Sequence, residues 1–153
     1  MNQQPAPDAA FLAHLKSAGE RVTTPRLTIF RLLARHSPLP MRKLADRAAG
    51  DGVDSVTVYR TIALFTRLGF VREIGMGRHR LLELSDDFGE HHHHFWCSQC
   101  GAVTDFDNPE LEQAIHAASQ ALGLTVQAHQ LEITGLCAAC SRLAQSSRNA
   151  HNL

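Results

Sequence analysis

The sequence predicts an α+β protein with two domains: an N-terminal winged helix-turn-helix domain over residues 1–84 and a small α/β dimerisation domain with a four-cysteine zinc site over residues 85–153. Two observations predict this division. The 153 residues have no net charge, but residues 1–84 hold 13 Lys and Arg against seven Asp and Glu, whereas residues 85–153 hold two against eight. The second part also contains seven of the ten histidines and all four cysteines. A basic part and an acidic part rich in metal ligands indicate polyanion binding combined with metal binding.

The overall composition excludes a disordered chain and a membrane-spanning one. Apolar residues make up 44% of the chain and charged residues 20%, which is enough apolar material to bury a core. No apolar run approaches the ~20 residues that span a bilayer. The first residues also lack the basic start and the apolar stretch of a secretory signal. We therefore expect a cytoplasmic protein without a membrane partner or a small-molecule substrate.

Helix-start signals predict four helices in the basic part. Asp8 is expected to cap the first helix, and Thr24-Pro25 marks the second, with Thr at the cap and Pro at the first helical position. Pro40 opens the third helix, and Asp54 or Ser55 caps the fourth. Apolar residues recur three or four positions apart in these helices, so each has a side that faces a core.

Two strands are expected after the helices, at residues 70–74 and 78–84, on either side of Gly75-Met76-Gly77. Helices followed by a basic hairpin are typical of a winged helix-turn-helix, whose last helix enters the major groove of DNA. The alternative is a small helical domain with a solvated basic face.

The fourth helix favours DNA binding. Its first turns carry Ser55, Thr57, Tyr59 and Arg60, which are groups that reach phosphates and base edges. An exposed Tyr beside an Arg is hard to explain as a merely solvated surface. A Tyr59 that packs against the neighbouring helix remains an alternative.

The four cysteines form two pairs, Cys97-x-x-Cys100 and Cys137-x-x-Cys140, with 36 residues between them. Two such pairs in a cytoplasmic protein fit a tetrahedral zinc site in which each pair supplies two thiolates from one tight turn. The alternatives are two disulfides, which conflict with a reducing compartment, and a redox pair, which does not explain two pairs. The spacing is long for a zinc finger, so we expect a β-α-β segment between the pairs.

A run of four histidines, residues 91–94, stands directly before the first cysteine pair. The alternatives are an affinity tag, although tags sit at termini, and a solvated polar loop. If the run is extended, His91 and His93 face one way while His92 and His94 face the other, so that one stretch feeds two metal sites.

Further ligands follow the run. Asn108-Pro109 opens a helix, and Glu112 and His116 lie outside the apolar side of this helix. Two strands are expected after the helix, at residues 125–130 and 131–135, and the first of them carries His129. Imidazole and carboxylate ligands together bind zinc, iron or manganese. A sheet edge in this part would also suit dimerisation.

The chain resembles the ferric uptake regulator family of metal-responsive bacterial repressors. The resemblance lies in Val22-Thr23-Thr24-Pro25-Arg26, in Thr57-Val58-Tyr59-Arg60, in the four histidines before CSQCG and in GLCAAC, in the family's order and spacing over about residues 15–141. It implies a homodimer that binds AT-rich inverted repeats of double-stranded DNA when loaded with metal, and that represses metal-uptake or stress genes.

The resemblance also implies roles for individual residues. Three sets match metal ligands, and a further set matches DNA-contacting positions. The residues that match the structural zinc ligands are Cys97, Cys100, Cys137 and Cys140. Those that match the regulatory site between the domains are Glu83, His92 and His94, and those that match the second site inside the dimerisation domain are His91, His93, Glu112 and His129. The residues that match DNA contacts are Tyr59, Arg60, Arg21 and Arg26. The implied cofactors are a structural Zn²⁺ and a second divalent ion, Fe²⁺, Zn²⁺ or Mn²⁺, as co-repressor.

The sequence departs from the family pattern at one ligand of the regulatory site. Iron-type and peroxide-sensing members carry a His after the second helix, where this chain has Pro38. His36, His79 or Asp105, which stands where peroxide-sensing members place a carboxylate ligand, is the candidate replacement. Zinc-sensing members usually have Cys where this chain has Glu83, which speaks against zinc as the sensed metal.

Three other functions compete with metal-dependent repression of metal-homeostasis genes. A zinc hydrolase or deaminase needs HExxH, or HxE with PCxxC, and neither occurs, so we expect no enzyme. A metal storage or chaperone protein would leave the basic winged helix without a use. A zinc-uptake or peroxide-stress regulator of the same family differs only in the signal it senses.

Overall fold

The structure, a computed structural model, describes residues 7–76 and 79–150. Its contacts divide the chain into two compact units, Met1–Glu90 and His91–Leu153. The charge distribution predicts a division at residue 84 instead. The difference arises because Phe88 is buried in the core of the first unit, so that the segment after residue 84 packs with the helices before it.

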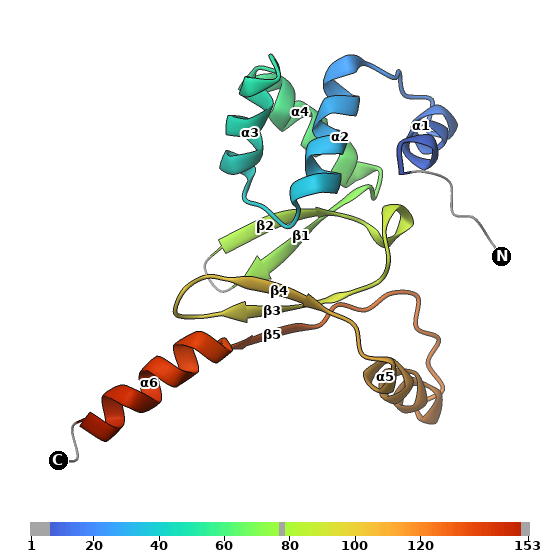
Figure 1. Cartoon of the computed structure of the whole chain (residues 1–153). Coiled ribbons are helices and arrows are strands. Elements are labelled where there is room, and N and C mark those ends of the chain that lie inside the picture. Colours follow the sequence, from blue (N-terminus) through green and yellow to red (C-terminus); the bar gives the residue numbers. More distant parts are fainter. Residues whose placement is uncertain (1–6, 77–78, 151–153) are drawn as a thin grey trace. The chain divides into compact units, whose positions relative to one another are not determined.

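The first unit consists of four helices and a hairpin, which Figure 1 shows in blue to yellow-green. The helices cover one face of the two strands, as a winged helix-turn-helix requires. The elements are α1 (Pro7–Ser17), α2 (Thr24–His36), α3 (Met41–Gly50), α4 (Ser55–Arg67), β1 (Val71–Met76), β2 (His79–Leu84) and a short 3-10 helix η1 (Asp86–Phe88). The strands are antiparallel, and Leu39, between α2 and α3, pairs with Leu82 at the edge of β2.

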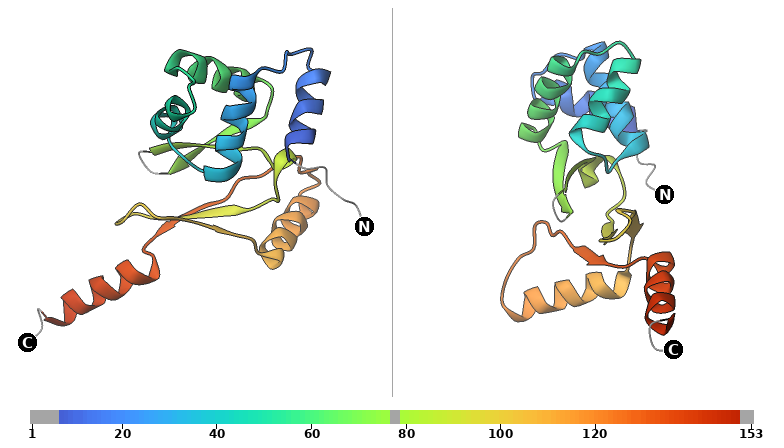
Figure 2. Two further views of the ribbon diagram at one scale, coloured as in Figure 1. Left: turned by 45° about the horizontal axis from the view of Figure 1, so that its top comes forward. Right: turned by 90° about the vertical axis from the view of Figure 1, so that its left-hand side faces the viewer.

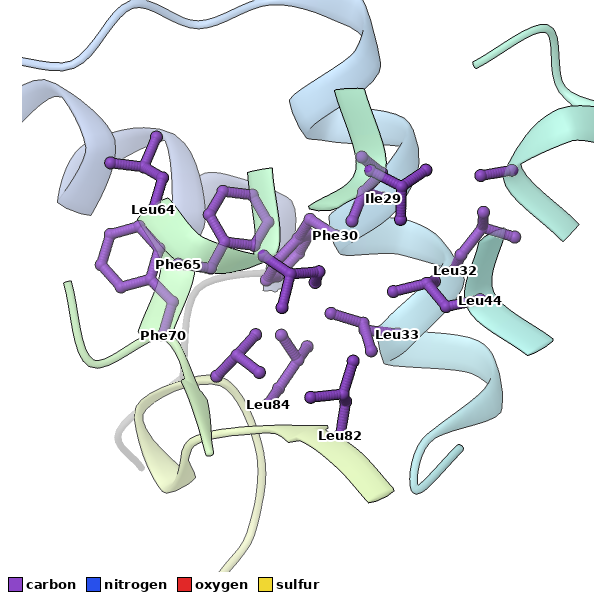
Figure 3. Close-up of a cluster of buried hydrophobic side chains, with 14 of the residues drawn as sticks. Ile29, Phe30, Leu32, Leu33, Leu44, Leu64, Phe65, Phe70, Leu82 and Leu84 are labelled. Atoms are coloured by element: carbon purple, nitrogen blue, oxygen red, sulfur yellow. The ribbon is translucent and has the colours of Figure 1, made fainter. Parts of the chain in front are cut away.

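Aromatic rings fill the centre of this unit. Phe11 and Phe30 are fully buried and stack with their ring centroids 4.1 Å apart, and Phe65 meets Phe11 edge-on at 5.4 Å. Figure 3 shows Leu82 and Leu84 of β2 directed toward the same cluster as Phe30 and Phe65. The core therefore fixes α4 against the hairpin, which sets the orientation of its outer side.

Phe11→Ala is expected to destabilise the first unit by about 3–5 kcal/mol, because the change removes a fully buried ring and leaves a cavity between two others. The free energy of unfolding in denaturant measures this loss. Leu12→Ala, at the half-buried neighbouring position, is the matched control and should cost clearly less. A cost for Phe11→Ala below that of Leu12→Ala would contradict this account of the core.

The structure confirms one of the predicted helix caps and corrects two. Asp54 caps α4, since its side chain accepts a hydrogen bond from the Thr57 amide at 3.0 Å. The cap of α2 is Thr23 rather than Thr24, and its side chain makes no capping bond. Asp8 lies inside α1 and not before it, and its carboxylate instead accepts a hydrogen bond of 2.7 Å from Arg31.

The second unit is a three-stranded sheet with two helices. Its elements are β3 (His93–Cys97), β4 (Val103–Phe106), α5 (Pro109–Ala121), β5 (Glu132–Gly135) and α6 (Ala138–Ala150). The strand order is β4-β3-β5, with β3 antiparallel to β4 and parallel to β5. Both views of Figure 2 show α6 running away from the end of β5.

The strand predicted at residues 125–130 is wrong, because this segment has no regular structure. Parallel strands need a long crossover connection. The chain from β4 to β5 provides it with α5 and the irregular segment that follows. The predicted β-α-β segment between the cysteine pairs therefore consists of β4, α5 and β5.

The buried residues of the second unit are polar or sulfur-containing. Among the residues of this unit whose burial the structure describes, only His93, His94, Cys97 and Cys140 are buried, and α5 buries none. The unit therefore lacks an aliphatic or aromatic core of its own in the part described. Over the described ranges, no helix has both the length and the apolar character to cross a membrane.

Candidate metal centres and nucleic-acid interface

The four cysteines converge at one end of the second sheet. Parallel pairing sets Cys97, at the end of β3, beside Gly135, at the end of β5, so the second cysteine pair follows directly next to the first. A left-handed Gly101 (φ 73°) closes the first turn, and its amide donates to the Cys97 carbonyl at 2.9 Å.

The spacing of the sulfurs fits a tetrahedral zinc ion. All four Sγ atoms lie within 4.8 Å of one another, and those of Cys100 and Cys137 are 3.9 Å apart. Zinc with Zn–S bonds of about 2.3 Å sets tetrahedral ligands about 3.8 Å apart. The cysteines are free rather than joined in disulfides. Four thiols at this spacing fit a structural zinc ion by both geometry and donor type.

The pKa values of two of these thiols are shifted in opposite directions. The Cys137 amide donates to Sγ of Cys97 at 3.3 Å, and with the amide of Cys100 it lowers the pKa of Cys97 to about 6. Hydrogen bonding with Cys137, together with burial, raises the pKa of Cys140 to about 12. The two amides therefore favour the thiolate form of Cys97, which is the form that binds a metal ion.

A second cluster contains His91, His93, Glu112 and His129, whose ligand atoms also lie within 4.8 Å of one another. The Nε2 atoms of His91 and His129 are 3.2 Å apart, and that of His129 is 3.2 Å from Oε2 of Glu112. These separations match the edges of about 3.3 Å expected for ligands with metal bonds near 2.05 Å. The site fits a four-coordinate ion bound by nitrogen and oxygen.

His93 and Glu112 of this second cluster are in direct contact. Nε2 of His93 lies 2.6 Å from Glu112, while its buried Nδ1 has no hydrogen-bond partner. Burial opposes ionisation of Glu112, but hydrogen bonds with His93 and His129 prevail and lower its pKa. An ionised carboxylate among three imidazoles is the donor set that zinc, iron or manganese binds.

Glu112→Gln is expected to remove one bound divalent ion per chain. Replacing the ligand itself should weaken binding at this cluster by more than about 100-fold, since even outer partners of ligands contribute about 10–100-fold. Metal analysis after equilibrium dialysis measures the stoichiometry. Glu110→Gln, on the same helix turn but exposed, is the matched control and should keep the ion. Unchanged stoichiometry in Glu112→Gln would show that the cluster binds no ion.

His92 and His94 lie on the opposite side of the strand from His91 and His93, with their own rings 4.8 Å apart. His94 is 3% exposed, and its Nδ1 lies 2.9 Å from the carboxylate of Asp105, its cross-strand partner on β4. The structure thus brings one candidate extra ligand, Asp105, to His94.

The other candidate ligands belong to the first unit. Glu83, on β2, is 2% exposed, and His36 is exposed at the end of α2. The side chain of His79 lies outside the described residues. Joint coordination of one ion by Glu83, His92 and His94 stays a prediction.

The alternative to a ligand role for Glu83 is a pair with a neighbouring Arg, and the structure shows such a partner. Arg72 of β1 stands opposite it in the hairpin register, and Nε of Arg72 donates a hydrogen bond to the Glu83 carboxylate. Nη2 of Arg72 lies 3.0 Å from Asp86. The alternation of charged residues on the two strands is a signal for this pair, but its register depends on where the hairpin turns.

A basic groove runs between the start of α2 and α4. It encloses about 600 Å³ and is lined by Glu20, Arg21, Thr23, Pro25, Arg26, Thr57, Arg60 and Thr61. Arg21 and Arg60 are exposed, as is Ser55 at the start of α4. Tyr59 is 55% exposed, so more than half of its surface is open to solvent.

Some predicted DNA contacts are engaged within the protein. Arg26 is 3.1 Å from Glu20 and donates to the Arg21 carbonyl at 2.6 Å. The Thr57 hydroxyl donates to Asp54 at 2.6 Å, which stabilises the start of α4. Glu20 also pairs with Arg67 at 3.2 Å, a partner that lies 47 residues away and that the sequence pattern does not indicate.

The fold and the clusters define a winged-helix protein with an attached metal-binding module. The model of the ferric uptake regulator family matches residues 17–134. The ferric uptake regulation protein of Neisseria gonorrhoeae is 32% identical over 139 residues, which cover 84% of this chain and 92% of that protein. The peroxide-responsive repressor PerR of Staphylococcus aureus is 30% identical over 133 residues, 84% of this chain and 88% of PerR.

A solved structure shows the same fold. The crystal structure of the Vibrio cholerae ferric uptake regulator has a TM-score of 0.69 and 28% identity, and covers 82% of this chain and 98% of that one. The chain belongs to the ferric uptake regulator family, a family of metal-responsive transcription regulators.

Proposed function

We propose that the protein is a metal-dependent transcriptional repressor that binds AT-rich inverted repeats as a homodimer and controls metal-homeostasis genes. The basic groove between α2 and α4 carries this proposal, since Arg21 and Arg60 line it. Tyr59, which is exposed, lies on the same helix as Arg60, and the core holds this helix in place. Cations position a protein on phosphates, while the helix side chains read bases. Its place of action is then the cytoplasm, where the operator DNA lies.

Two kinds of metal have separate roles in this proposal. Zn²⁺ in the cysteine cluster is structural, while a second divalent ion, Fe²⁺, Zn²⁺ or Mn²⁺, acts as co-repressor at Glu83, His92 and His94. The chemistry of these side chains supports this assignment, because a carboxylate and imidazoles are the ligands that zinc, iron and manganese bind. His91, His93, Glu112 and His129 form the second site.

The homodimer is supported by apolar side chains that the second unit leaves exposed. Leu122 and Leu143 are 73% and 64% exposed, and further exposed members are Leu124, Val126, Ile133 and Leu136. A unit that has no apolar core among its described residues, and whose apolar side chains face outward, is typical of a domain that buries them against a partner. A second copy of the chain is the partner we propose.

Titration of DNA binding with metal tests the function. The zinc-loaded protein is mixed with operator-like AT-rich palindromic DNA and with random DNA at physiological salt, while free Fe²⁺, Zn²⁺ or Mn²⁺ is varied. We expect one of these ions to raise affinity for the palindrome selectively. Binding that responds to no divalent ion, or that is equal for both DNAs, contradicts metal-dependent repression, and strong metal uptake without DNA binding would favour a storage or chaperone protein.

Arg60→Ala is expected to weaken binding to every DNA sequence by about tenfold and to lower the salt slope by about one, as the loss of a phosphate contact does. Tyr59→Phe should instead change the preferred sequence, because it removes a hydroxyl near base edges. Fluorescence anisotropy at several salt concentrations measures both effects. Arg35→Ala, an exposed Arg outside the groove, is the control. An Arg60→Ala effect restricted to one sequence would assign Arg60 to bases rather than phosphates.

Peroxide sensing is a second candidate, favoured by the contact between Asp105 and His94. A carboxylate near this histidine adds a hard oxygen ligand suited to Fe²⁺ or Mn²⁺. If the protein senses peroxide, hydrogen peroxide should release DNA from the Fe²⁺ form, because Fe²⁺ is readily oxidised, and spare the Mn²⁺ form. Equal retention of DNA by both forms would exclude this signal.

A further inference from the structure

Glu83 is held by a cation of its own hairpin. Arg72 faces it across β1 and β2, and Nε of Arg72 donates to Oε1 of Glu83. The Glu83 side chain is 2% exposed and that of Arg72 19%, so water screens this pair little. Because an unpaired buried carboxylate is strongly unfavourable, the pair stabilises the hairpin in the absence of metal.

The same guanidinium has a second anionic partner. Nη2 of Arg72 lies 3.0 Å from Oδ1 of Asp86, whose side chain is 39% exposed. Arg72 thus bridges a buried carboxylate and a more exposed one. A planar guanidinium has enough donors for both, so Arg72 stays paired if it loses Glu83.

We propose that Arg72 is a built-in competitor of the regulatory metal: it holds Glu83 while the metal is absent and shifts onto Asp86 when the metal binds. The inference rests on the proposed role of Glu83 as a metal ligand. A divalent cation and a guanidinium repel each other, and both require the oxygens of Glu83. Arg72 therefore raises the free metal concentration that the protein needs for loading.

The two partners of Arg72 act on metal binding with opposite signs. Removing Arg72 takes away both the competing donor and a positive charge, so metal binding becomes tighter. Removing the charge of Asp86 takes away the alternative partner and leaves Arg72 on Glu83 alone, so metal binding becomes weaker. This reversal of sign distinguishes competition from a general loss of structure.

Titration of the zinc-loaded full-length protein with Mn²⁺, followed by the electron paramagnetic resonance of the free ion, tests the proposal. A buffer at about pH 8 disfavours a proton on the freed carboxylate. The Mn²⁺ that wild type binds and Glu83→Gln does not bind is the ion that depends on Glu83. For that ion we expect Arg72→Gln to bind about tenfold more tightly than wild type and Asp86→Asn about threefold more weakly.

Two controls carry the same changes of charge at exposed positions. Arg80→Gln lies on the same hairpin and loses an exposed pair with Glu73, and Asp87→Asn is adjacent to Asp86. Both should stay within about twofold of wild type, because exposed pairs are weak and screened.

Stability provides an independent readout. Without Mn²⁺, Arg72→Gln should unfold at a lower temperature than wild type, because Glu83 is left buried without this partner, and it should gain more thermal stability from Mn²⁺. If Arg72→Gln does not fold, Mn²⁺ binding by Asp86→Asn, a change at an exposed position, tests the competition alone.

The failures of the two proposals differ. If Arg72→Gln binds Mn²⁺ as tightly as wild type or more weakly, the competition is overturned, but Glu83 remains a ligand. The same holds if only Asp86→Asn folds and its Mn²⁺ binding is unchanged. Equal Mn²⁺ binding by Glu83→Gln and wild type overturns the ligand assignment itself.

Discussion

Cys97→Ser and Cys140→Ser proteins are expected to lose the zinc ion and, with it, the folded second unit and the dimer. Both cysteines are buried in a unit that has no apolar core among its described residues, so the ion contributes much of its folding free energy. Zinc content should fall from one ion per chain at the cysteine cluster to none. Light scattering should give the mass of a monomer, and circular dichroism should show loss of sheet and helix from this unit.

Gln99→Ala is the matched control for the cysteine variants. Gln99 lies between Cys97 and Cys100 in the same turn but is exposed, so its replacement should leave zinc, fold and dimer intact. The first unit has its own aromatic core and should still unfold cooperatively in the cysteine variants. A zinc-free Cys97→Ser/Cys140→Ser protein that remains folded and dimeric would refute a structural role for the ion.

Glu83→Ala and His92→Ala are expected to abolish metal-activated DNA binding while fold, structural zinc and dimer remain. If the proposed co-repressor ion binds to Glu83 and His92, it favours the DNA-competent arrangement only because its affinity for that arrangement is higher. Removing one ligand should raise the free metal concentration for half-maximal DNA binding by about 100-fold or more. In the wild type, metal raises the affinity for operator DNA by some factor, and thermodynamic reciprocity requires that operator DNA raises the affinity for metal by the same factor.

Two exposed positions provide controls for the switch. Glu73→Ala removes an acid from the same hairpin, and His116→Ala removes a histidine from the second unit. Both should respond to metal as the wild type does. If the Glu83→Ala/His92→Ala double variant needs the same free metal concentration as the wild type for operator binding, these residues are not regulatory ligands.

Local signals in the sequence were sufficient for the helices of the first unit and for the cysteine site. Asp54 caps α4 as its position before an apolar-periodic run predicts, and two closely spaced cysteine pairs leave few other uses for the thiols. The helix caps and each cysteine pair consist of residues that are neighbours in the chain, so local pattern and spacing carry the information.

Features that depend on pairing between distant segments were harder to predict. The segment 125–130 alternates in a strand-like way, but β3 pairs with β4 and β5 and leaves this segment as a connection. The contact of Arg72 with Glu83 requires the register of the hairpin, and a shift by one residue would send one of the two side chains to the opposite face. Single-sequence patterns do not define such registers.

The absence of an apolar core in the described part of the second unit affects how the protein is made in a cell. The first unit precedes all four cysteines in the chain and has its own buried aromatic cluster, so it can fold while synthesis continues. The second unit cannot complete its zinc site until Cys137 and Cys140, the last two ligands, have been synthesised. In a zinc-starved cell, new chains would therefore carry a finished N-terminal unit and an unfolded tail that proteases degrade. The number of working copies then follows the zinc supply at the time of synthesis, whichever ion the regulatory site later detects.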